Sequence, residues 1–288
     1  MLRLTNVAKS FGQQEIFHSV NIEVSQGQCL GLIGPNGTGK TTLLRCVSQS
    51  LKPDQGEITY KGRTEFPVHL SIESDRSLFP RLTALENIKY LLGLQGISCQ
   101  RQQVTEIAEQ FEFLPHLNVP AQKLSKGSKQ KVQAILTVLS PHSLLILDEP
   151  TLGLDNQVEQ VLIDALANKL ALGHIILLSS HNVELCSQLC HQLFDLGSGK
   201  LLDVSDGELE KVYSIQLAHP LDESVSHQIE TLGIPVNKNK AHLTLTSQQL
   251  AQALPILPGI ESIKTTGLSM LERHEDSHEQ SQNLSQSI

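Results

Sequence analysis

Residues 34–42 constrain the fold of this chain more than any other segment. They read GPNGTGKTT and follow a short apolar run at residues 29–33. A strand, a glycine-rich loop, a lysine next to a hydroxyl residue and then a helix form the pattern of a loop that holds nucleotide phosphates. The residues expected to contact the nucleotide here are Gly34, Pro35, Asn36, Gly37, Thr38, Gly39, Lys40, Thr41 and Thr42. We therefore expect this chain to bind ATP or GTP.

Each residue type in this loop has a physical role. Glycines let backbone N–H groups close around phosphate oxygens, and the helix that begins near Lys40 directs the positive end of its dipole at them. Lys40 is expected to reach the β- and γ-phosphates, and Thr41 is expected to hold Mg²⁺.

Two carboxylates follow a second apolar run. Residues 144–147 are Leu-Leu-Ile-Leu, without alternation, as is typical of a parallel strand buried on both faces. Asp148 and Glu149 come directly after it, so they would lie at the carboxyl edge of the sheet, beside the glycine loop. Asp148 would bind Mg²⁺, directly or through water, and Glu149 would polarise the attacking water. The alternative is a solvated pair of carboxylates that ends a core strand.

A third motif lies between these two. Residues 124–130, LSKGSKQ, open a helix with an apolar stripe at helical spacing. Here the chain resembles the ATP-binding cassette (ABC) ATPases, whose LSGGQ signature this segment approximates. Residues 151–155, TLGLD, resemble the D-loop of that family, and His181, after a further apolar run, resembles its switch histidine. The resemblance covers about residues 1–205.

The resemblance implies a dimer in which each ATP is contacted by residues of both cassettes. Two cassettes of that family stack head to tail, so Ser125 and Gly127 would contact ATP held by the Lys40 loop of the partner, with Asp155 at the same seam. A hydroxyl and backbone N–H groups at a helix N-terminus suit a γ-phosphate. ATP would then hold the two cassettes together, and Glu149 and His181 would act in its hydrolysis.

The signature segment departs from the family pattern. Lys126 replaces a glycine and Ser128 replaces the glutamine. Cations in the first turn of a helix oppose its dipole by roughly 0.3 to 1 kcal/mol each, so Lys126 and Lys129 are unfavourable unless an anion compensates them. The hypothesis is that this anion is the triphosphate bound to the partner. The alternative is that these two lysines, together with Lys123 and Lys131, form a surface that faces either solvent or a membrane partner.

A second departure concerns the glutamine that the family carries after a strand expected near residues 68–72. This chain has no glutamine there, and either Glu73 or Ser74 takes its place, depending on a shift of one residue. Glu73 would hold metal or water instead. The alternative is slow hydrolysis, with ATP binding as the main switch.

Adenine usually needs an aromatic platform. Residues 9–12, KSFG, resemble the A-loop of the family, and Phe11 would stack on the base. The alternative is that Phe11 belongs to the core of an N-terminal strand.

The fold class expected is α/β, a P-loop NTPase of the ABC cassette type. Its mixed sheet would carry an antiparallel β subdomain and, at about residues 74–140, a helical subdomain, and the whole cassette would span residues 1–205. Residues 206–271 read as an accessory α+β domain in the order β-α-β-β-α-β, similar to a ferredoxin-like fold, with a strand expected at residues 234–236. Residues 272–288 are polar and are expected to be a disordered tail.

Composition narrows the environment and the partners. The net charge of −8 argues against a nucleic-acid partner. No apolar run has the length of a membrane span and no signal-peptide pattern opens the chain, so we expect a cytoplasmic location. Five cysteines suit a reducing compartment. Cys186, Cys190 and His191 suggest a metal site, but the two cysteines share an apolar helical stripe, which favours the core.

The function that follows is the ATP-hydrolysing subunit of an ABC transporter. It would be an exporter, because small C-terminal extensions of this kind are similar to those on ATPases of bacterial ABC exporters. The partners would be a second cassette and an integral membrane permease, with the chain peripheral on the cytoplasmic face of the membrane. A coupling segment of the permease would contact the surface near residues 78–81. The alternatives are a soluble ABC ATPase of translation or repair and an ATP-binding switch with low turnover.

Overall fold

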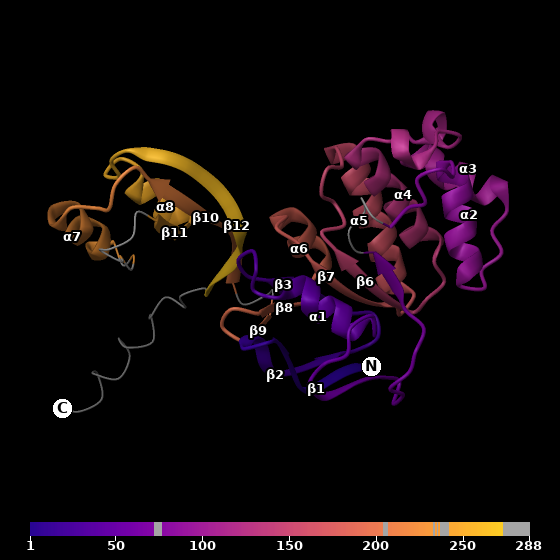
Figure 1. Cartoon of the computed structure of the whole chain (residues 1–288), viewed down its shortest axis with the longest axis horizontal. Coiled ribbons are helices and arrows are strands. Elements are labelled where there is room, and N and C mark those ends of the chain that lie inside the picture. The colour runs from indigo at the N-terminus through magenta and orange to yellow at the C-terminus, as the bar shows by residue number, and fades with distance from the viewer. Residues whose placement is uncertain (72–76, 204–206, 233, 235, 237–241, 273–288) are drawn as a thin grey trace, which may run out of the picture.

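The computed structural model describes residues 1–71, 77–203, 207–232, 234, 236 and 242–272 (Figure 1). In these residues the largest sheet has six strands in the order β5-β6-β7-β3-β8-β9. All neighbouring pairs are parallel except β8 and β9. The strands are β3 (Cys29–Ile33), β5 (His69–Ser71), β6 (Leu144–Asp148), β7 (Ile175–Ser179), β8 (Gln192–Asp195) and β9 (Lys200–Asp203). The mixed sheet expected from the sequence is confirmed.

Apolar layers cover both faces of this sheet, which explains why its central strands lack polar alternation. Leu145 and Leu147 point into a core built with five helices on one face. Leu144 and Ile146, one residue out of phase on the same strand, point into a core on the other face. The core on the first face includes α4 (Lys126–Leu139), α5 (Asn156–Ala171) and α6 (Val183–Leu189), together with α2 (Ala84–Leu94) and α3 (Arg101–Gln110), which pack on α4.

The second face packs against α1 (Lys40–Val47) and an antiparallel sheet of three strands within the described residues. That sheet has the order β2-β1-β4, with β1 (Leu2–Phe11), β2 (Gln14–Val24) and β4 (Gln55–Tyr60). Leu2 lies opposite Val24 on one side and Tyr60 on the other. Leu2 and Leu4 are buried while their neighbours Arg3 and Thr5 are exposed, as expected for a sheet with one face on the core.

The helical lobe begins with a strong local signal. Thr83 caps α2 by accepting a hydrogen bond from the backbone N–H of Glu86, whose carboxylate accepts one from the backbone N–H of Thr83 at 2.8 Å. The buried Asn87 then donates to the carbonyls of Phe79 and Leu82 at 3.1 Å each, which fixes the chain that enters the helix. The 3₁₀ turns η1 (Leu114–His116) and η2 (Ala121–Lys123) lead from α3 to α4.

The C-terminal residues form their own small core. Within the described part of the chain, three antiparallel strands take the order β11-β10-β12 and pack with α7 and α8. The elements are β10 (Gly207–Leu217), α7 (Glu223–Thr231), β11 (His242–Thr246), α8 (Ser247–Ala253) and β12 (Ile260–Glu272). The division into a cassette at 1–205 and an accessory domain at 206–271 remains a proposal.

Two expectations for this region need correction. Ile234 and Val236 lie outside any strand, so the described residues give three strands and not the four of a ferredoxin-like sheet. Ile234 is buried in the core, but in the sequence it is followed by Pro235, which lacks the N–H that a strand within a sheet donates. The tail was expected from residue 272, whereas Glu272 ends β12 and pairs with Gly207. Residues 273–288 lie outside the described residues.

Candidate functional site

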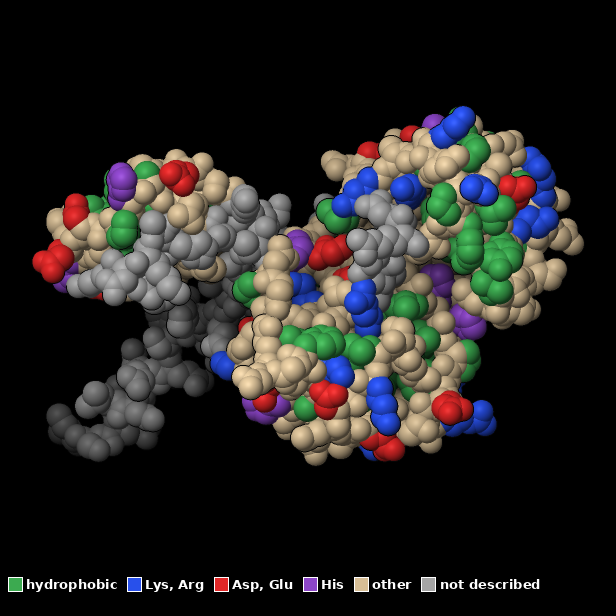
Figure 2. Space-filling view, viewed as in Figure 1, with side chains coloured by type: hydrophobic (Ala, Val, Ile, Leu, Met, Phe, Trp, Pro, Cys, Tyr) green, Lys and Arg blue, Asp and Glu red, His purple; other side chains and the backbone are tan. Residues whose placement is uncertain are grey.

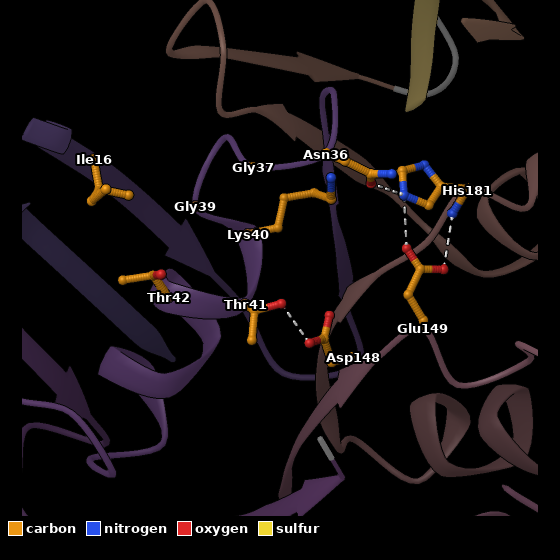
Figure 3. Close-up of a pocket in the computed structure, with 10 residues that line it drawn as sticks. All are labelled: Ile16, Asn36, Gly37, Gly39, Lys40, Thr41, Thr42, Asp148, Glu149 and His181. Atoms are coloured by element: carbon orange, nitrogen blue, oxygen red, sulfur yellow. Dashed lines mark hydrogen bonds and ion pairs between the residues drawn. The ribbon is translucent and has the colours of Figure 1, made fainter. Parts of the chain in front are cut away.

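The carboxyl ends of β3, β6 and β7 meet the start of α1 at a pocket of about 260 Å³ (Figure 3). This is the edge of a parallel sheet at which ligands bind. Glycine-loop residues, both carboxylates of the second motif and the expected switch histidine all line it. The lining residues are Ile16, Asn36, Gly37, Gly39, Lys40, Thr41, Thr42, Asp148, Glu149 and His181.

The glycine loop wraps around the Lys40 side chain. Its Nζ donates to the carbonyl of Gly34 at 2.7 Å and to that of Pro35 at 3.1 Å. Burial lowers the pKa of Lys40, and the carboxylates of Glu149 and Asp148 partly offset this effect. The ammonium is therefore held within the loop by neutral carbonyl dipoles, which a phosphate oxygen can outcompete.

The start of α1 lacks a cap of its own. Gly39 occupies the N-cap position with φ +102°, and a Cβ there would collide with Ile16 Cγ2. No side chain accepts a hydrogen bond at this N-cap, and no acidic residue lies in the first turn. The first amide groups of a helix have no partner within the helix, so these donors suit an anion. This cradle fits the phosphates of a nucleotide.

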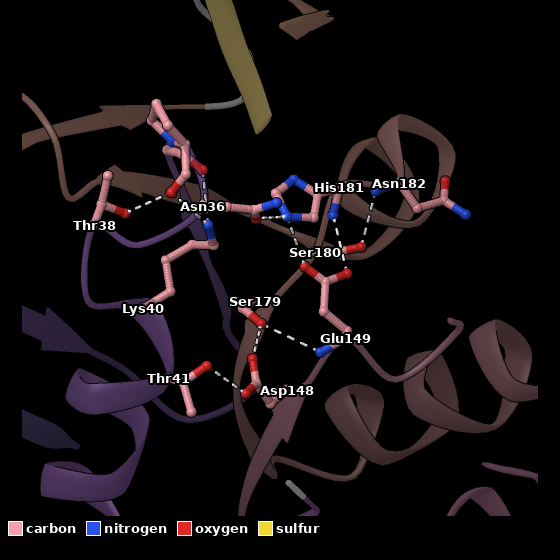
Figure 4. A network of polar contacts seen from close by, with 12 residues as sticks. Asn36, Thr38, Lys40, Thr41, Asp148, Glu149, Ser179, Ser180, His181 and Asn182 are labelled. Atoms are coloured by element: carbon pink, nitrogen blue, oxygen red, sulfur yellow. Dashed lines mark hydrogen bonds and ion pairs between the residues drawn. The ribbon is translucent and has the colours of Figure 1, made fainter. Parts of the chain in front are cut away.

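Thr41 and Asp148 meet at the floor of the pocket. Thr41 Oγ1 donates to Asp148 Oδ2 at 2.6 Å, and the Ser179 hydroxyl donates to Asp148 Oδ1 (Figure 4). A hydroxyl and a carboxylate this close, beside a phosphate cradle, are the oxygen ligands that Mg²⁺ takes together with phosphate oxygens. The residues present therefore fit the ion that the sequence predicts.

Glu149 adopts an unusual backbone conformation. Its φ is +48°, the left-handed region that costs a non-glycine residue about 1 to 2 kcal/mol. The backbone N–H of Glu149 lies 3.1 Å from the carbonyl oxygen and 3.2 Å from the hydroxyl of Ser179, which holds the residue in place. The carboxylate then turns into the pocket, where Oε2 accepts from the backbone N–H of His181 at 3.3 Å. Burial raises the pKa of Glu149 to about 7.

His181 faces Glu149 across the pocket. Its Nε2 lies 3.1 Å from Glu149 Oε1 and 3.0 Å from Asn36 Oδ1 (Figure 4). Both neighbours are acceptors, so Nε2 carries the hydrogen, and the buried Nδ1 has no hydrogen-bond partner among the described residues. Burial, with the positive charge of Lys40, lowers the pKa of His181 and keeps the ring neutral near pH 7.

The signature and D-loop residues do not line this pocket. Ser125 is exposed and caps α4, accepting from the backbone N–H of Ser128 at 3.1 Å. Gly127 contacts Gly153, because a Cβ on Gly127 would lie 2.6 Å from the Gly153 carbonyl oxygen. Asp155 caps α5 and also pairs with Lys131 at 3.2 Å. The structure thus brings the signature and D-loop segments together, apart from the Lys40 pocket.

The expected adenine platform stands at the end of β1. Phe11 is 52% exposed, so the alternative that it belongs to the core is wrong. Lys9 Nζ lies 5.5 Å from the centroid of the Phe11 ring. Phe11 does not line the pocket, whereas Ile16, in the facing strand β2, does. Glu73 and Ser74, the two candidates for the missing glutamine, lie outside the described residues.

Three residues at or behind the site were not anticipated from the sequence. Ile16 has no motif around it, and Ser179 stands out only as a polar end to an apolar run. Gln130 is buried and donates through Nε2 to the carbonyl of Pro150 at 2.8 Å. Its position in the signature segment was the only available signal.

The cysteine prediction is confirmed. Cys186 and Cys190 are buried in the core on the helical face of the sheet, with Cys190 Sγ 3.7 Å from Cys29 Sγ. Across the part of the chain that the structure describes, no group of three or more histidine, cysteine, aspartate and glutamate side chains is arranged to hold a metal ion by itself. Nor does any helix in those residues have the length and apolar character needed to cross a membrane.

Comparisons with known proteins agree with this geometry. The family described as ABC transporter matches residues 17–152. The chain is 35% identical over 222 residues to the uncharacterized ABC transporter ATP-binding protein YhaQ of Bacillus subtilis, covering 74% of this chain and 72% of that protein. It is 31% identical over 209 residues to the Nod factor export ATP-binding protein I of Sinorhizobium fredii, covering 69% and 61%.

Solved structures share the fold. The ATP-binding cassette MJ0796, in a dimeric post-hydrolysis state with ADP and Pi, superposes with a TM-score of 0.63 at 20% identity and covers 71% of this chain and 99% of that one. An ATP-binding subunit of an ABC transporter superposes with a TM-score of 0.62 at 20% identity and covers 88% and 99%. A match over 71% of this chain has about the length of residues 1–205. The match over 88% is longer than that and therefore includes residues beyond 205.

Proposed function

The chain belongs to the ABC transporter family of ATP-binding proteins, and from that premise we propose that it is the ATPase of an exporter, acting on a separate membrane permease. The observation that carries the proposal is the placement of Glu149. Its carboxylate enters the pocket beside Asp148 and His181, opposite the phosphate cradle around Lys40. A buried carboxylate at that place suits the activation of a water that attacks a phosphate.

The phosphates of ATP would replace the carbonyl contacts of Lys40. The ammonium would turn from Gly34 and Pro35 to the β- and γ-phosphates, where the uncapped amides of α1 add further donors. Thr41 and Asp148 would hold Mg²⁺, which when bound supplies positive charge to the phosphate oxygens. Phe11 and Ile16 would border the base and sugar.

Glu149 would orient the attacking water and take up its proton. Asp148 and Glu149 thereby have different roles, although they are adjacent: Asp148 is tied to two hydroxyls, and Glu149 stays unbonded to Thr41 and faces the pocket. The neutral ring of His181 would position the γ-phosphate with the hydrogen on Nε2, at the side of the pocket where Asn36 now accepts it. No part of this sequence of steps needs Glu73, whose role as a further metal or water ligand is proposed from the family pattern alone.

Two copies, or this chain and a related one, would form a head-to-tail pair. Ser125 and Gly127 of one cassette would complete the ATP site of the other, with Asp155 at the seam. In support of this arrangement, Ser125 is exposed, and MJ0796, whose fold this chain shares, was solved as a dimer. Binding of ATP would close the pair, and hydrolysis would open it.

Export and the membrane partner rest on two further observations. The Nod factor export proteins are named for export, and several of them match this chain. Figure 2 shows hydrophobic side chains gathered over the helical lobe. In this lobe Phe79 packs edge to face on Tyr90 of α2 with ring centroids 5.0 Å apart, although each side chain is more than two-fifths exposed. We propose that the surface formed by residues 78–81 and Tyr90 receives the permease on the cytoplasmic face of the membrane.

The test is the turnover of a Glu149→Gln variant. Loss of the carboxylate should lower the ATPase kcat by about 1,000-fold, while the affinity for ATP stays within about threefold, because Glu149 acts on water and not on the phosphate grip. Glu109→Gln, an exposed change on α3, serves as a control and should leave kcat unchanged. Wild-type turnover in Glu149→Gln would refute the assigned role.

The transporter proposal has a separate test. The tagged chain should sediment with membranes in its native cell and co-purify in detergent with a polytopic membrane protein. Phe79→Ser with Tyr90→Ser should abolish that recovery and leave ATP hydrolysis by the purified chain intact. A chain that stays out of the membrane fraction with ATP present would favour a soluble ABC ATPase.

A further inference from the structure

The start of α4 is attached from behind to the segment that carries Glu149. The Gln130 side chain, 6% exposed, lies on the second turn of this helix. Its Nε2 donates to the carbonyl of Pro150 at 2.8 Å and approaches that of Glu149 at 3.4 Å. Because this buried amide group donates to two successive carbonyl oxygens, it fixes the orientation of the backbone between Glu149 and Pro150.

That peptide decides where the Glu149 carboxylate points. The residue has a left-handed φ of +48°, which a glutamate adopts only when its surroundings impose it. Ser179 of β7 holds the N–H on one side, at 3.1 Å from its carbonyl oxygen. On the other side the carbonyl of Glu149 accepts from the backbone N–H of Leu152 at 3.1 Å and lies next to Gln130. The carboxylate is thus aimed by contacts to its backbone from both directions.

Two further contacts join the same pair of segments. Gly127 touches the Gly153 carbonyl so closely that a Cβ would lie 2.6 Å away. Lys131 pairs with Asp155 at 3.2 Å, and its side chain is 16% exposed. Residues 127, 130 and 131 of α4 therefore contact residues 149–155 at three points, and Gln130 is the one that contacts the backbone of Glu149 itself.

We propose that Gln130 is a positioning residue for Glu149, and that through it the helix bearing Ser125 and Gly127 sets the aim of the carboxylate within the same chain. The inference rests on the proposed function. In the head-to-tail pair, Ser125 and Gly127 would serve the partner's ATP while Glu149 serves its own. Contact between α4 and the partner's nucleotide would then change the position of the Glu149 carboxylate through the buried side-chain amide of Gln130. This would couple the two ATP sites.

The test is Gln130→Met, which keeps the length and volume of the side chain and removes the donor. The ATPase kcat should fall about 10- to 100-fold, as expected when a reacting group is displaced by about an ångström. The KM and the dissociation constant for ATP should stay within about threefold, because the phosphate grip lies on α1. Gln130→Glu, which places an oxygen against the two carbonyls, should lower kcat at least as far.

Gln133 supplies a matched control on the same helix. It is equally buried, and its Nε2 donates at 2.8 Å to the hydroxyl of Ser77 and not to the segment after β6. Gln133→Met should lower the unfolding midpoint about as much as Gln130→Met while keeping kcat within about twofold. An equal loss of kcat in both variants, or a Gln130→Met enzyme within twofold of wild type, would overturn the inference.

A double variant separates this inference from the function on which it rests. If Gln130 acts through Glu149, then Gln130→Met combined with Glu149→Gln should be no slower than Glu149→Gln alone. A further tenfold loss in the double variant would mean that Gln130 acts elsewhere. Full turnover in the Glu149→Gln single variant would instead refute the role of the carboxylate, whatever the behaviour of Gln130.

Discussion

The helices α1 and α4 each begin within a sequence motif that is expected to contact nucleotide, yet the amide groups of their first turns are satisfied in opposite ways. α1 has Gly39 at its N-cap and no side chain to satisfy those amides. α4 has Ser125, whose hydroxyl already accepts from the backbone N–H of Ser128 and donates to the Ser128 hydroxyl. The lysine of α1 is 7% exposed and folded into its loop, whereas Lys126 of α4 is exposed.

This difference indicates which end can bind phosphate unaided. The start of α1 combines open amide donors, a buried ammonium and two adjacent oxygen ligands within one pocket. At the start of α4, the Ser125 side chain already accepts a hydrogen bond from a first-turn amide, and Gln130 is bonded to the segment that follows Glu149. This helix start is therefore less suited to binding phosphate alone than to transmitting the binding of a ligand to Glu149. The comparison predicts that variants at α1 change affinity and that variants at α4 change turnover or pairing.

The largest effect on affinity is expected at Lys40. Lys40→Met removes the charged donor from the cradle and should weaken ATP binding about 100-fold, since a hydrogen bond to a charged group contributes up to about 3 kcal/mol. Equilibrium titration with a fluorescent ATP analogue measures the change. The control is Lys169→Met, because Lys169 Nζ also donates to a carbonyl, that of Ser140 at 2.7 Å, but lies away from the pocket. Equal weakening in both would show that the effect is general destabilisation.

The anchorage of α4 to the sheet should depend on pH. The buried His69 of β5 lies 3.0 Å from Thr137 Oγ1 of α4, and burial lowers its pKa from 6.5 to about 3. Below pH 6.5 the unfolded chain binds a proton that the folded chain excludes, so stability is retained above that pH and falls below it. From pH 7 to pH 5 the wild type should lose about 2 kcal/mol more than His69→Gln.

Urea unfolding followed by circular dichroism at the two pH values gives this difference. Parallel losses in the wild type and His69→Gln would show that the histidine takes up its proton without unfolding. The comparison with the variant is needed because Glu149, whose pKa is raised to about 7, stabilises the fold toward low pH and so acts in the opposite direction.

A smaller effect is expected where α4 touches the D-loop segment. Gly127→Ala brings a Cβ to 2.6 Å from the Gly153 carbonyl, and this backbone must shift. The kcat should fall about tenfold, while the affinity of the unpaired chain for ATP stays unchanged, because the displaced segment leads back to Glu149 and not to α1. Gly93→Ala on α2, where a Cβ meets open space, is the control and should leave kcat unaltered. Weakened ATP binding by the unpaired Gly127→Ala chain would break the distinction between the two helices.

The smallest effect concerns the two lysines in the first turn of α4. If they meet the triphosphate held by the partner, Lys126→Gly with Lys129→Ala should flatten the salt dependence of ATP-driven pairing, each charge contributing about 0.3 to 1 kcal/mol. Analytical ultracentrifugation of the Glu149→Gln background at several salt concentrations measures it without consuming ATP. A variant with the salt dependence of the wild type would place these lysines on an ordinary solvated surface.

Much of this pocket was predictable because it depends on where strands end. A parallel strand that ends in a glycine loop and another that ends in Asp148 and Glu149 must present both at one edge of the sheet. The structure accordingly places Thr41 Oγ1 and Asp148 Oδ2 2.6 Å apart, although 107 positions separate them in the sequence. The helical lobe was signalled in the same local way, by the capping box at Thr83 and Glu86.

The contacts behind the pocket were not predictable by such rules. Gln130 and Ser179 act through side-chain bonds to backbone groups whose positions depend on packing between distant elements. Ile16 enters the pocket only because β2 runs past Gly39 in space. The strand expected at residues 234–236 shows the opposite error, since apolar residues there serve the core without joining the sheet. Periodicity indicates burial, but it does not indicate which backbone groups find partners.

The uncapped backbone amides at the start of α1 also affect the stability of the single chain, before any partner binds. The N–H donors of this loop find strong acceptors only in the phosphates of a nucleotide. ATP would therefore stabilise the folded chain by binding to it, in addition to being hydrolysed. At a concentration 100 times the dissociation constant, it would add about 2.7 kcal/mol to the free energy of unfolding.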